Sequence, residues 1–473
     1  MTGPSLPPLG QLTVTRSVCA TCRRLVQARV VRRVDGIWFE KFCPDHGRQD
    51  VKVADDAEAY LDAHRYHRVA SRPLEFATAW RGRCPDDCGL CPEHEQHVCM
   101  PIIEITDHCD MHCPICLVQN ANSWHMTRAE LERLLDRLIA AEERIDVVNL
   151  SGGEPTCHPQ FREMVEACLA RPEILRVSVS TNGRHLVGDD ALLRFLAERR
   201  VVVSLQFDGT EPGYRQALRG CRDARLDLLD RLTALEAPCS LTFTLAPAAP
   251  EAALAEAVEA LFTRPNVLSL MIQPAAYVGR GQRFGATQSR RIFMPEAIDR
   301  VARASRGRVR PGNFSPLPCS HPNCFSLSFF LRAPDGTFVS LKELFAMETY
   351  LDLIRNRTLF GTDPENFGKI EAAVYDLWSG PAALAPDSEK ALGAVRRLLR
   401  QVQSSCPGGC FEPAHLLAVA ERQVKSIFVH AFMDPGTFDL TRVRKCCQVY
   451  PLRDGRFVPA CVYNVRGRSA PAA

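Results

Sequence analysis

Three closely spaced cysteines, Cys109, Cys113 and Cys116, give the first indication of chemistry in this chain. They form a C-x3-C-x2-C pattern directly after an apolar stretch that predicts a strand. Three thiolates on one tight loop can hold three irons of a [4Fe-4S] cube, because cysteine thiolate is the usual ligand of such clusters. The fourth iron then lacks a protein ligand and can chelate a small molecule. A structural zinc knuckle is the alternative that this motif alone leaves open.

A second motif, Gly152-Gly153-Glu154-Pro155, follows about one βα unit later in the chain. Two glycines allow a backbone to approach a ligand closely, and the carboxylate beside them can hold the ammonium group of a bound amino acid. Gly-Gly-Glu-Pro alone is weak evidence, but its position after the cysteine motif makes it specific. The two motifs together predict a site-differentiated cluster that binds a small molecule.

The chain has 21 cysteines, and most of the others also fall into groups with metal-ligand spacing. In a reducing compartment such clusters are better explained as metal thiolates than as disulfides. One group predicts an auxiliary [4Fe-4S] cluster, with zinc as the alternative. A second predicts a mononuclear site for zinc or rubredoxin-like iron. The predicted ligands of the auxiliary cluster are Cys84, Cys88, Cys91 and Cys99. Those of the mononuclear site are Cys19, Cys22, Cys43 and His46.

A third cluster is predicted near the carboxyl terminus, with Cys319, Cys324, Cys447 and Cys461 as ligands. Adjacent residues of a strand point to opposite faces, so one of Cys446 and Cys447 is expected to be a ligand, with Cys446 as the alternative. Cys406 and Cys410 form a competing pair. The remaining four cysteines in or beside barrel elements are interpreted as buried or ordinary thiols: Cys157, Cys168, Cys221 and Cys239.

Short apolar runs that alternate with helical patterns must position these residues. The runs begin near residues 100, 146, 176, 201, 240 and 267, and the helical patterns include 127–143, 160–170, 190–199 and 251–262. Such alternation predicts an α/β fold with a parallel sheet. Six strands over this length favour a TIM-like partial (β/α)6 barrel, although an open doubly wound sheet fits the same pattern.

Smaller modules are predicted on either side of this barrel. The division is 1–55 for a zinc-knuckle or rubredoxin-like module, 56–99 for a connector with the auxiliary-cluster segment, 100–310 for the barrel and 311–473 for an α+β domain with the last cluster. Residues 55–81 of the connector are expected to be helical. Hairpins are predicted at Asp35-Gly36 and Asp335-Gly336, and helices at 386–403 and 413–431.

The composition excludes several classes of protein. The net charge is +3, from 58 basic and 55 acidic residues spread along the chain, so nucleic acid is not expected as a partner. No apolar run is long enough to cross a bilayer, and the amino terminus does not have the pattern of a signal peptide. A cytoplasmic protein is expected, with peripheral membrane contact if the substrate is a lipid.

With its cysteine and Gly-Gly-Glu-Pro motifs, the chain resembles the radical SAM superfamily over roughly residues 100–275. The resemblance implies that Cys109, Cys113 and Cys116 hold a [4Fe-4S] cluster whose open iron binds S-adenosylmethionine (SAM). Many members have an aromatic residue before the third cysteine, where this chain has Ile115. The residues that it implies for SAM binding are Gly152, Gly153, Glu154, Pro155, Ser180, Thr181, Asn182, Gln206, Asp208 and Gln273.

Segments outside this region, such as CPDDCGLCPEHEQHVC and VHAFMDPGTFDLTRVRKCC, are similar to the tetraether lipid synthase and class D radical SAM methylase group. With the cysteine groups above, this resemblance implies three [4Fe-4S] clusters and one mononuclear zinc or iron, and a flavodoxin or ferredoxin is expected as electron donor. The resemblance implies reductive cleavage of SAM to a 5′-deoxyadenosyl radical, followed by carbon–carbon coupling of lipid tails or methylation of a pterin precursor. Phe325, Phe329 and Phe330 could line a lipid cavity or belong to an ordinary core. A peptide- or cofactor-maturing enzyme and a non-catalytic electron carrier are the other hypotheses.

Overall fold

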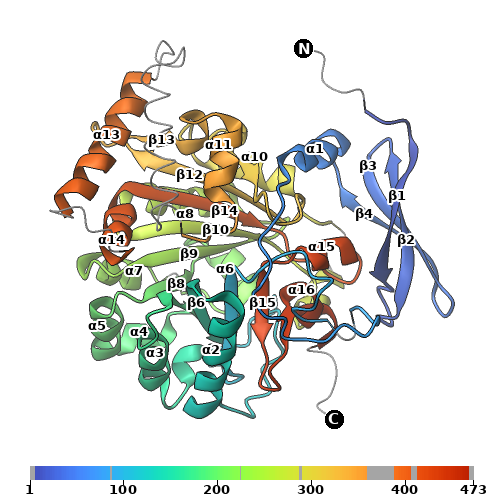
Figure 1. Ribbon diagram of the computed structural model, residues 1–473, viewed down its shortest axis with the longest axis horizontal. Helices are drawn as coiled ribbons and strands as arrows, with labels where there is room; N and C mark the ends of the chain where they lie inside the picture. Colours follow the sequence, from blue (N-terminus) through green and yellow to red (C-terminus); the bar gives the residue numbers. More distant parts are fainter. Residues whose placement is uncertain are drawn as a thin grey trace.

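Two sheets organise the computed structural model of this chain, which describes residues 6–85, 88–223, 225–286, 290–359, 388–405 and 413–467. The smaller sheet is an antiparallel meander of β1 (Gly10–Val18), β2 (Leu25–Arg33), β3 (Gly36–Cys43) and β4 (Gly47–Ala54). It stands at one side of the molecule (Figure 1). The predicted hairpin turn joins β2 to β3, where Gly36 has a φ of +129° that its lack of a Cβ permits.

Six parallel strands form the centre of the large sheet, as predicted. They are β5 (Met100–Thr106), β6 (Ile145–Gly152), β7 (Ile174–Thr181), β8 (Val202–Gln206), β9 (Cys239–Leu245) and β10 (Val267–Pro274), in this spatial order. Because parallel strands need crossover connections, helices follow most of them and cover one face. Figure 1 shows α2 (Arg128–Glu142), α3 (Phe161–Leu169), α5 (Asp190–Glu198), α7 (Leu226–Ala234) and α8 (Glu251–Thr263) on this outer layer.

Local sequence explains why these helices form where they do. In α2, the side chain of Thr127 accepts from the backbone N–H of Glu130 while the Glu130 carboxylate accepts in return from Thr127, a complete capping box. Leu131, Leu135 and Leu138 recur on one face of α2 and are buried against the sheet. These contacts belong to the largest apolar core of the molecule, which lies between the strands and the outer helices.

The carboxyl-terminal part of the chain joins the same sheet at both of its ends. Strand β14 (Val424–His430) pairs in parallel with β10, and β15 (Gln448–Pro451) pairs in parallel with β5. Outside them lie the antiparallel β12 (Phe325–Arg332) and β16 (Phe457–Pro459), with β11 (Ser315–Pro316) and β13 (Phe338–Ser340) beside β12. The predicted α/β barrel architecture is confirmed, and the terminal segment contributes strands to its wall.

Two helical predictions were wrong. Residues 413–431 were expected to form one helix, but α14 (Pro413–Gln423) ends before the strand β14, whose sequence Val-Lys-Ser-Ile-Phe-Val-His is rich in β-branched and aromatic residues. The connector is helical only in α1 (Ala57–Asp62) and the turn at Ala63–Tyr66, and residues 67–85 are irregular. Cys84, Cys88 and Cys91 lie in or beside this irregular stretch.

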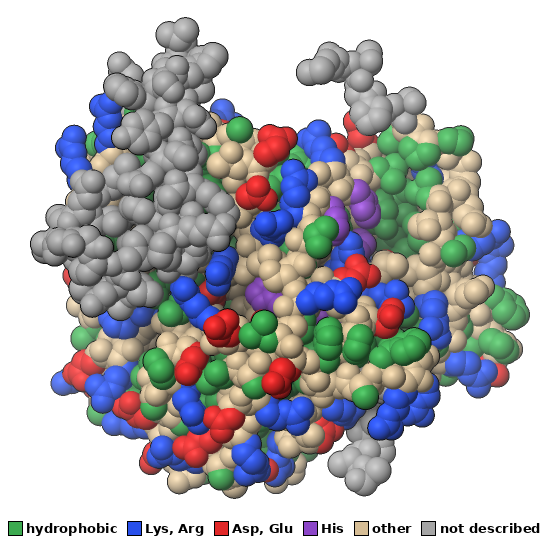
Figure 2. Space-filling model, in the orientation of Figure 1, with side chains coloured by type: hydrophobic (Ala, Val, Ile, Leu, Met, Phe, Trp, Pro, Cys, Tyr) green, Lys and Arg blue, Asp and Glu red, His purple; other side chains and the backbone are tan. Residues whose placement is uncertain are grey.

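The other described helices are α4 (Arg184–Gly188), α6 (Pro212–Arg219), α9 (Gly281–Ala286), α10 (Met294–Ala304), α11 (Met347–Ile354), α13 (Ser388–Ser405), α15 (Leu440–Arg444) and α16 (Ala460–Val462). No described helix is both long and apolar enough to cross a membrane. Figure 2 shows basic and acidic side chains interspersed over the visible face.

Candidate functional site

The cluster loop, residues 107–127, carries the three motif cysteines at the carboxyl end of β5. All three side chains are half-buried. The thiol of Cys109 accepts from the backbone N–H of Met111, and that of Cys116 accepts from Val118, each at 3.4 Å. Backbone donors to sulfur are a feature of protein-bound iron–sulfur clusters. Burial raises the pKa of Cys109 to about 12, so iron binding there displaces a proton.

The two glycines of the second motif allow β6 to approach the cluster loop. A Cβ on Gly152 would lie 2.0 Å from the Thr106 carbonyl oxygen, and one on Gly153 would lie 2.2 Å from that of His108. Gly153 donates its N–H to Thr106, and Glu154 donates to His108. The sequence predicted a close approach to a ligand, but the approach found here is between two backbone segments.

Glu154 links the segments that follow two neighbouring strands. Its carboxylate is buried and accepts from the hydroxyls of Thr156 and Thr181, both at 2.7 Å, and from the N–H of Asn182, also at 2.7 Å. Burial raises the pKa of Glu154, while these donors oppose the rise. Because its oxygens are used in this way, Glu154 ties the end of β6 to the end of β7. The amide of Asn182 donates to Asp110 on the cluster loop.

A cavity of about 230 Å³ lies beside the cluster loop and the ends of the strands. Of the residues predicted for SAM, Gly152, Gln206 and Gln273 line it, together with Cys116, a predicted cluster ligand. Gly153, Glu154, Pro155, Thr181, Asn182 and Asp208 are not part of its lining, and Ser180 lines a second cavity instead. The lining residues that sequence reasoning missed include Glu104, Arg219, Thr244, Phe432 and Tyr450.

Arg219, at the end of α6, places a positive charge between this cavity and the cluster loop. Its Nε donates to the fully buried carboxylate of Asp208 at 2.7 Å, and its guanidinium also donates to Thr244 at 2.6 Å and to the Cys113 thiol. Burial disfavours the charge, but Asp208 outweighs burial and raises the pKa of Arg219. Asp208 therefore acts through Arg219 and does not reach the cavity itself.

The second cavity, of about 340 Å³, occupies the interior of the barrel. It is lined by strands from β5 to β10 and by both added strands, since Gln448 of β15 and His430 of β14 lie in the same wall. The sheet thus curves around a lumen. The two cavities share Leu117, Ser151, Gln273, Phe432 and Tyr450 in their linings, so they are contiguous.

The lumen wall is mainly apolar and carries a smaller set of polar side chains. Asn149 bonds to the hydroxyls of Ser178 and Ser180, at 2.6 and 3.0 Å, and Ser240 bonds to Ser269 at 2.6 Å. These residues face inward because alternate residues of a strand point to the same side. The lumen is suited to a ligand with several hydrogen-bonding groups.

The structure regroups the auxiliary cysteines. Cys99 forms hydrogen bonds with Cys319 and Cys447 rather than standing with Cys84, Cys88 and Cys91. We call Cys99, Cys319 and Cys447 group A. The other thiols form a continuous set of neighbours. The thiol of Cys88 lies near those of Cys84, Cys91 and Cys446. The thiol of Cys446 also lies near those of Cys324 and Cys461. Group B comprises Cys84, Cys88, Cys91, Cys324, Cys446 and Cys461.

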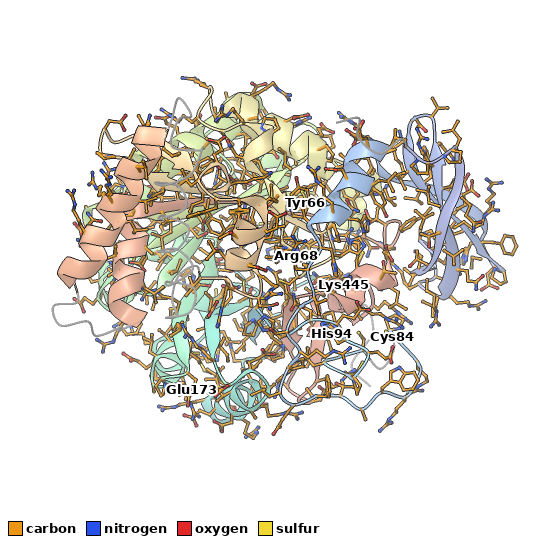
Figure 3. All side chains as sticks on the ribbon, turned by 45° about the horizontal axis from the view of Figure 1, so that its top comes forward. Tyr66, Arg68, Cys84, His94, Glu173 and Lys445 are labelled. Carbon is orange, nitrogen blue, oxygen red and sulfur yellow. The ribbon has the colours of Figure 1, made fainter. Side chains whose placement is uncertain are left out.

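The adjacent Cys446 and Cys447 explain this regrouping. As predicted, they face opposite sides, and each side holds other cysteines, so both can be ligands. His94 fixes this turn, because its Nε2 lies 2.9 Å from the carbonyl oxygen of Cys446. Figure 3 shows His94 close to Lys445, with Cys84 nearby. Cys406 and Cys410 lie outside the described residues.

The four residues predicted for the mononuclear site come together in the smaller sheet. Nδ1 of His46 lies 3.7 Å from the Cys19 sulfur and 3.6 Å from that of Cys43, which lies 3.8 Å from that of Cys22. Burial raises the pKa of Cys19, but hydrogen bonds donated by Cys22, Thr21 and Gln49 together outweigh this effect and lower the pKa to about 6. A thiolate is therefore available for a tetrahedral zinc or iron.

Comparisons with known proteins agree with this geometry. Residues 103–261 match the model of the radical SAM superfamily, and residues 11–55 match that of the HMPTM N-terminal zinc ribbon domain. A 7,8-dihydro-6-hydroxymethylpterin dimethyltransferase of Methanocaldococcus jannaschii is 23% identical in an alignment 500 positions long that covers 96% of this chain and 94% of that protein.

Two further matches cover less. A GTP 3',8-cyclase of Synechococcus elongatus is 28% identical over 156 residues, or 32% of this chain and 46% of that protein. The solved structure of Streptococcus suis SuiB bound to S-adenosylmethionine aligns with a TM-score of 0.37 and 16% identity over 44% of this chain and 46% of that one. The chain thus spans less than half the length of either. From the superfamily match and the cysteine loop beside its cavity, we conclude that this chain carries a radical SAM domain preceded by a zinc ribbon.

Proposed function

We propose that this protein is a radical SAM methyltransferase that acts on a small polar heterocycle of the pterin class. The observation that carries the proposal is the barrel lumen, which is contiguous with the cavity at the cluster loop and whose mainly apolar wall also presents hydroxyl and amide groups. Its volume of about 340 Å³ falls in the usual range for small-molecule sites, roughly 300–1,000 Å³. The relative that matches along nearly the whole chain bears the name of a pterin dimethyltransferase.

In this proposal Cys109, Cys113 and Cys116 hold the [4Fe-4S] cluster, and the adjoining cavity receives SAM. The guanidinium of Arg219 suits a carboxylate, since it lines that cavity. When bound, cluster and SAM supply the one-electron chemistry that takes a hydrogen atom from an unactivated carbon. The strand ends orient the substrate and exclude water. Groups A and B would hold auxiliary [4Fe-4S] clusters. The zinc ribbon would hold zinc or iron, and a flavodoxin or ferredoxin would supply electrons.

Coupling of lipid tails has less support. Of the three phenylalanines that could line a lipid cavity, Phe329 lines the lumen, while Phe330 is 1% exposed and packs edge-on against Phe262 in the core. Asn149 and Ser178 bond to each other but keep further hydrogen-bonding capacity, which an aliphatic tail cannot use. A polar ring system can use this capacity. The lumen wall therefore favours the heterocycle over the lipid.

The proposal is tested by anaerobic turnover of reconstituted protein. The assay contains dithionite, SAM and 7,8-dihydro-6-hydroxymethylpterin, with and without a small-molecule cell extract as a source of one-carbon donors. We expect 5′-deoxyadenosine and a methylated pterin by mass spectrometry, and neither from Cys113→Ala. Ser240→Leu, which fills the lumen but not the cavity at the cluster loop, should still form 5′-deoxyadenosine without methylating the pterin. Methylation of an isoprenoid lipid instead of the pterin would contradict the substrate class.

A further inference from the structure

A group of metal-binding side chains lies on the outer flank of the cluster loop, apart from both cavities. Asp110, Cys157 and His185 each bring one potential ligand atom to within 4.8 Å of the others. Asp110 and Cys157 are half-buried and His185 is exposed, so an ion from solvent can reach them. Asp110 comes from the cluster loop, Cys157 from the turn Pro155–Cys157 after β6, and His185 from α4 after β7. The sequence had indicated only an ordinary thiol at Cys157.

The distances within this group match those of the zinc ribbon. Nε2 of His185 lies 3.7 Å from the Cys157 sulfur and 3.7 Å from Oδ2 of Asp110. In the ribbon, His46 lies 3.6 and 3.7 Å from its two cysteine sulfurs. With zinc–ligand bonds of about 2.0–2.3 Å, atoms at such spacing fit adjacent corners of one tetrahedron.

The polar atoms of His185 and Asp110 that do not face the proposed metal position form hydrogen bonds, as those of metal ligands usually do. Nδ1 of His185 lies 3.2 Å from the carbonyl oxygen of Thr156, so it donates there and leaves Nε2 with its lone pair. Oδ1 of Asp110 accepts from Asn182 at 2.7 Å, which leaves Oδ2 facing the histidine. A second hydrogen bond of this kind, on the atom that does not bind metal, fixes tautomer and orientation.

The same geometry argues against a nucleophilic Cys-His-Asp relay. In a relay, the carboxylate and the nucleophile bind opposite ring nitrogens. Here, Asp110 and Cys157 both face Nε2 of His185. Nε of Arg184 also lies 3.7 Å from Oδ2 of Asp110, but its guanidinium is held by the backbone carbonyl oxygen of Asp110 at 2.9 Å, which leaves Oδ2 without a short bond to arginine.

We propose that Asp110, Cys157 and His185 form a second zinc site, with water as a fourth ligand. The thiolate and the imidazole select a borderline-soft ion over magnesium or calcium. A zinc ion there would join the cluster loop to the segments that follow β6 and β7. It would thereby brace the loop that holds Cys109 and Cys113.

The test measures zinc bound by anaerobically purified protein that contains its clusters, by dialysis against zinc buffers and elemental analysis. We expect wild type to bind one more zinc per chain than Cys157→Ala or His185→Ala, since the ribbon contributes equally in all. Cys221→Ala, which removes a half-buried thiol elsewhere, is the matched control and should bind as wild type does. Equal zinc contents in all four proteins would overturn the proposal.

A second measurement uses wild type only, so it does not depend on how the variants fold. Added zinc should slow labelling of Cys157 by N-ethylmaleimide at least tenfold, while labelling of Cys221 stays unchanged in peptide mapping. Equal rates at Cys157 with and without zinc would refute the site.

Discussion

At the scale of single residues, the pair of Asp208 and Arg219 connects the strand ends to the cluster loop. Arg219→Gln should leave the buried Asp208 carboxylate unpaired, which costs about 3–5 kcal/mol, and should also weaken SAM binding. Arg194→Gln is the control, because Arg194 and its partner Asp190 are 62% and 67% exposed and such pairs contribute about 0–1 kcal/mol. Urea unfolding and equilibrium dialysis with SAM measure the two effects. Equal urea midpoints for the two variants would contradict this role of Asp208.

The two cysteine groups make a second prediction about residues. If Cys99 and Cys447 bind one auxiliary cluster and Cys446 another, Cys99→Ala/Cys447→Ala should lose no more iron than either single variant. Cys99→Ala/Cys446→Ala should lose about four irons more than a single variant, because the iron losses at two independent cluster sites are additive. Iron and sulfide analysis of anaerobic protein provides the counts. The opposite pattern would restore the set of Cys84, Cys88, Cys91 and Cys99 that the spacing predicted.

At the scale of elements, the end of β6 must lie against the cluster loop for that loop to keep its shape. Gly153→Ala should force the two backbones apart, since its Cβ would meet three backbone atoms of His108 and Asp107 within 2.8 Å. We expect loss of about four irons per chain, the content of one cube. Gly188→Ala is the control, because nothing lies within 4 Å of a Cβ there. Full iron content in Gly153→Ala would show that the contact is not needed.

At the scale of the whole molecule, Lys41 attaches the zinc ribbon to the carboxyl-terminal segment. Its ammonium group is buried and donates to the carbonyl oxygens of Val18, Pro435 and Gly436 at 3.0, 3.2 and 2.7 Å. Lys41→Met should leave these carbonyls without a donor and loosen the ribbon, which faster hydrogen exchange in β1 and residues 435–439 would reveal. Lys52→Met, which removes a pair with Asp35 and a contact with the Trp38 ring, both inside the ribbon, should leave hydrogen exchange in β1 and residues 435–439 unchanged. Equal exchange in both variants would argue against this attachment.

Features formed by residues close together in the sequence could be predicted, whereas contacts between residues far apart in the sequence could not. Cys109, Cys113 and Cys116 share one loop, and the apolar runs of β5 to β10 repeat with clear spacing, so both could be identified from the chain alone. The partners of Cys99 are more than 200 residues away in sequence, and spacing cannot assign such contacts. Arg219 carries no motif, and its role depends on Asp208 and Thr244 from neighbouring strands.

The most direct test of the central claim is electron–nuclear double resonance on the dithionite-reduced protein with SAM labelled at its amino nitrogen and carboxylate oxygens. The account predicts hyperfine coupling of both labels to a reduced [4Fe-4S] cluster, because three cysteines leave one iron open to them. The coupling should vanish in Cys113→Ala while the signals of auxiliary clusters persist. Wild-type protein with its full iron content but no coupling to either label would contradict the account.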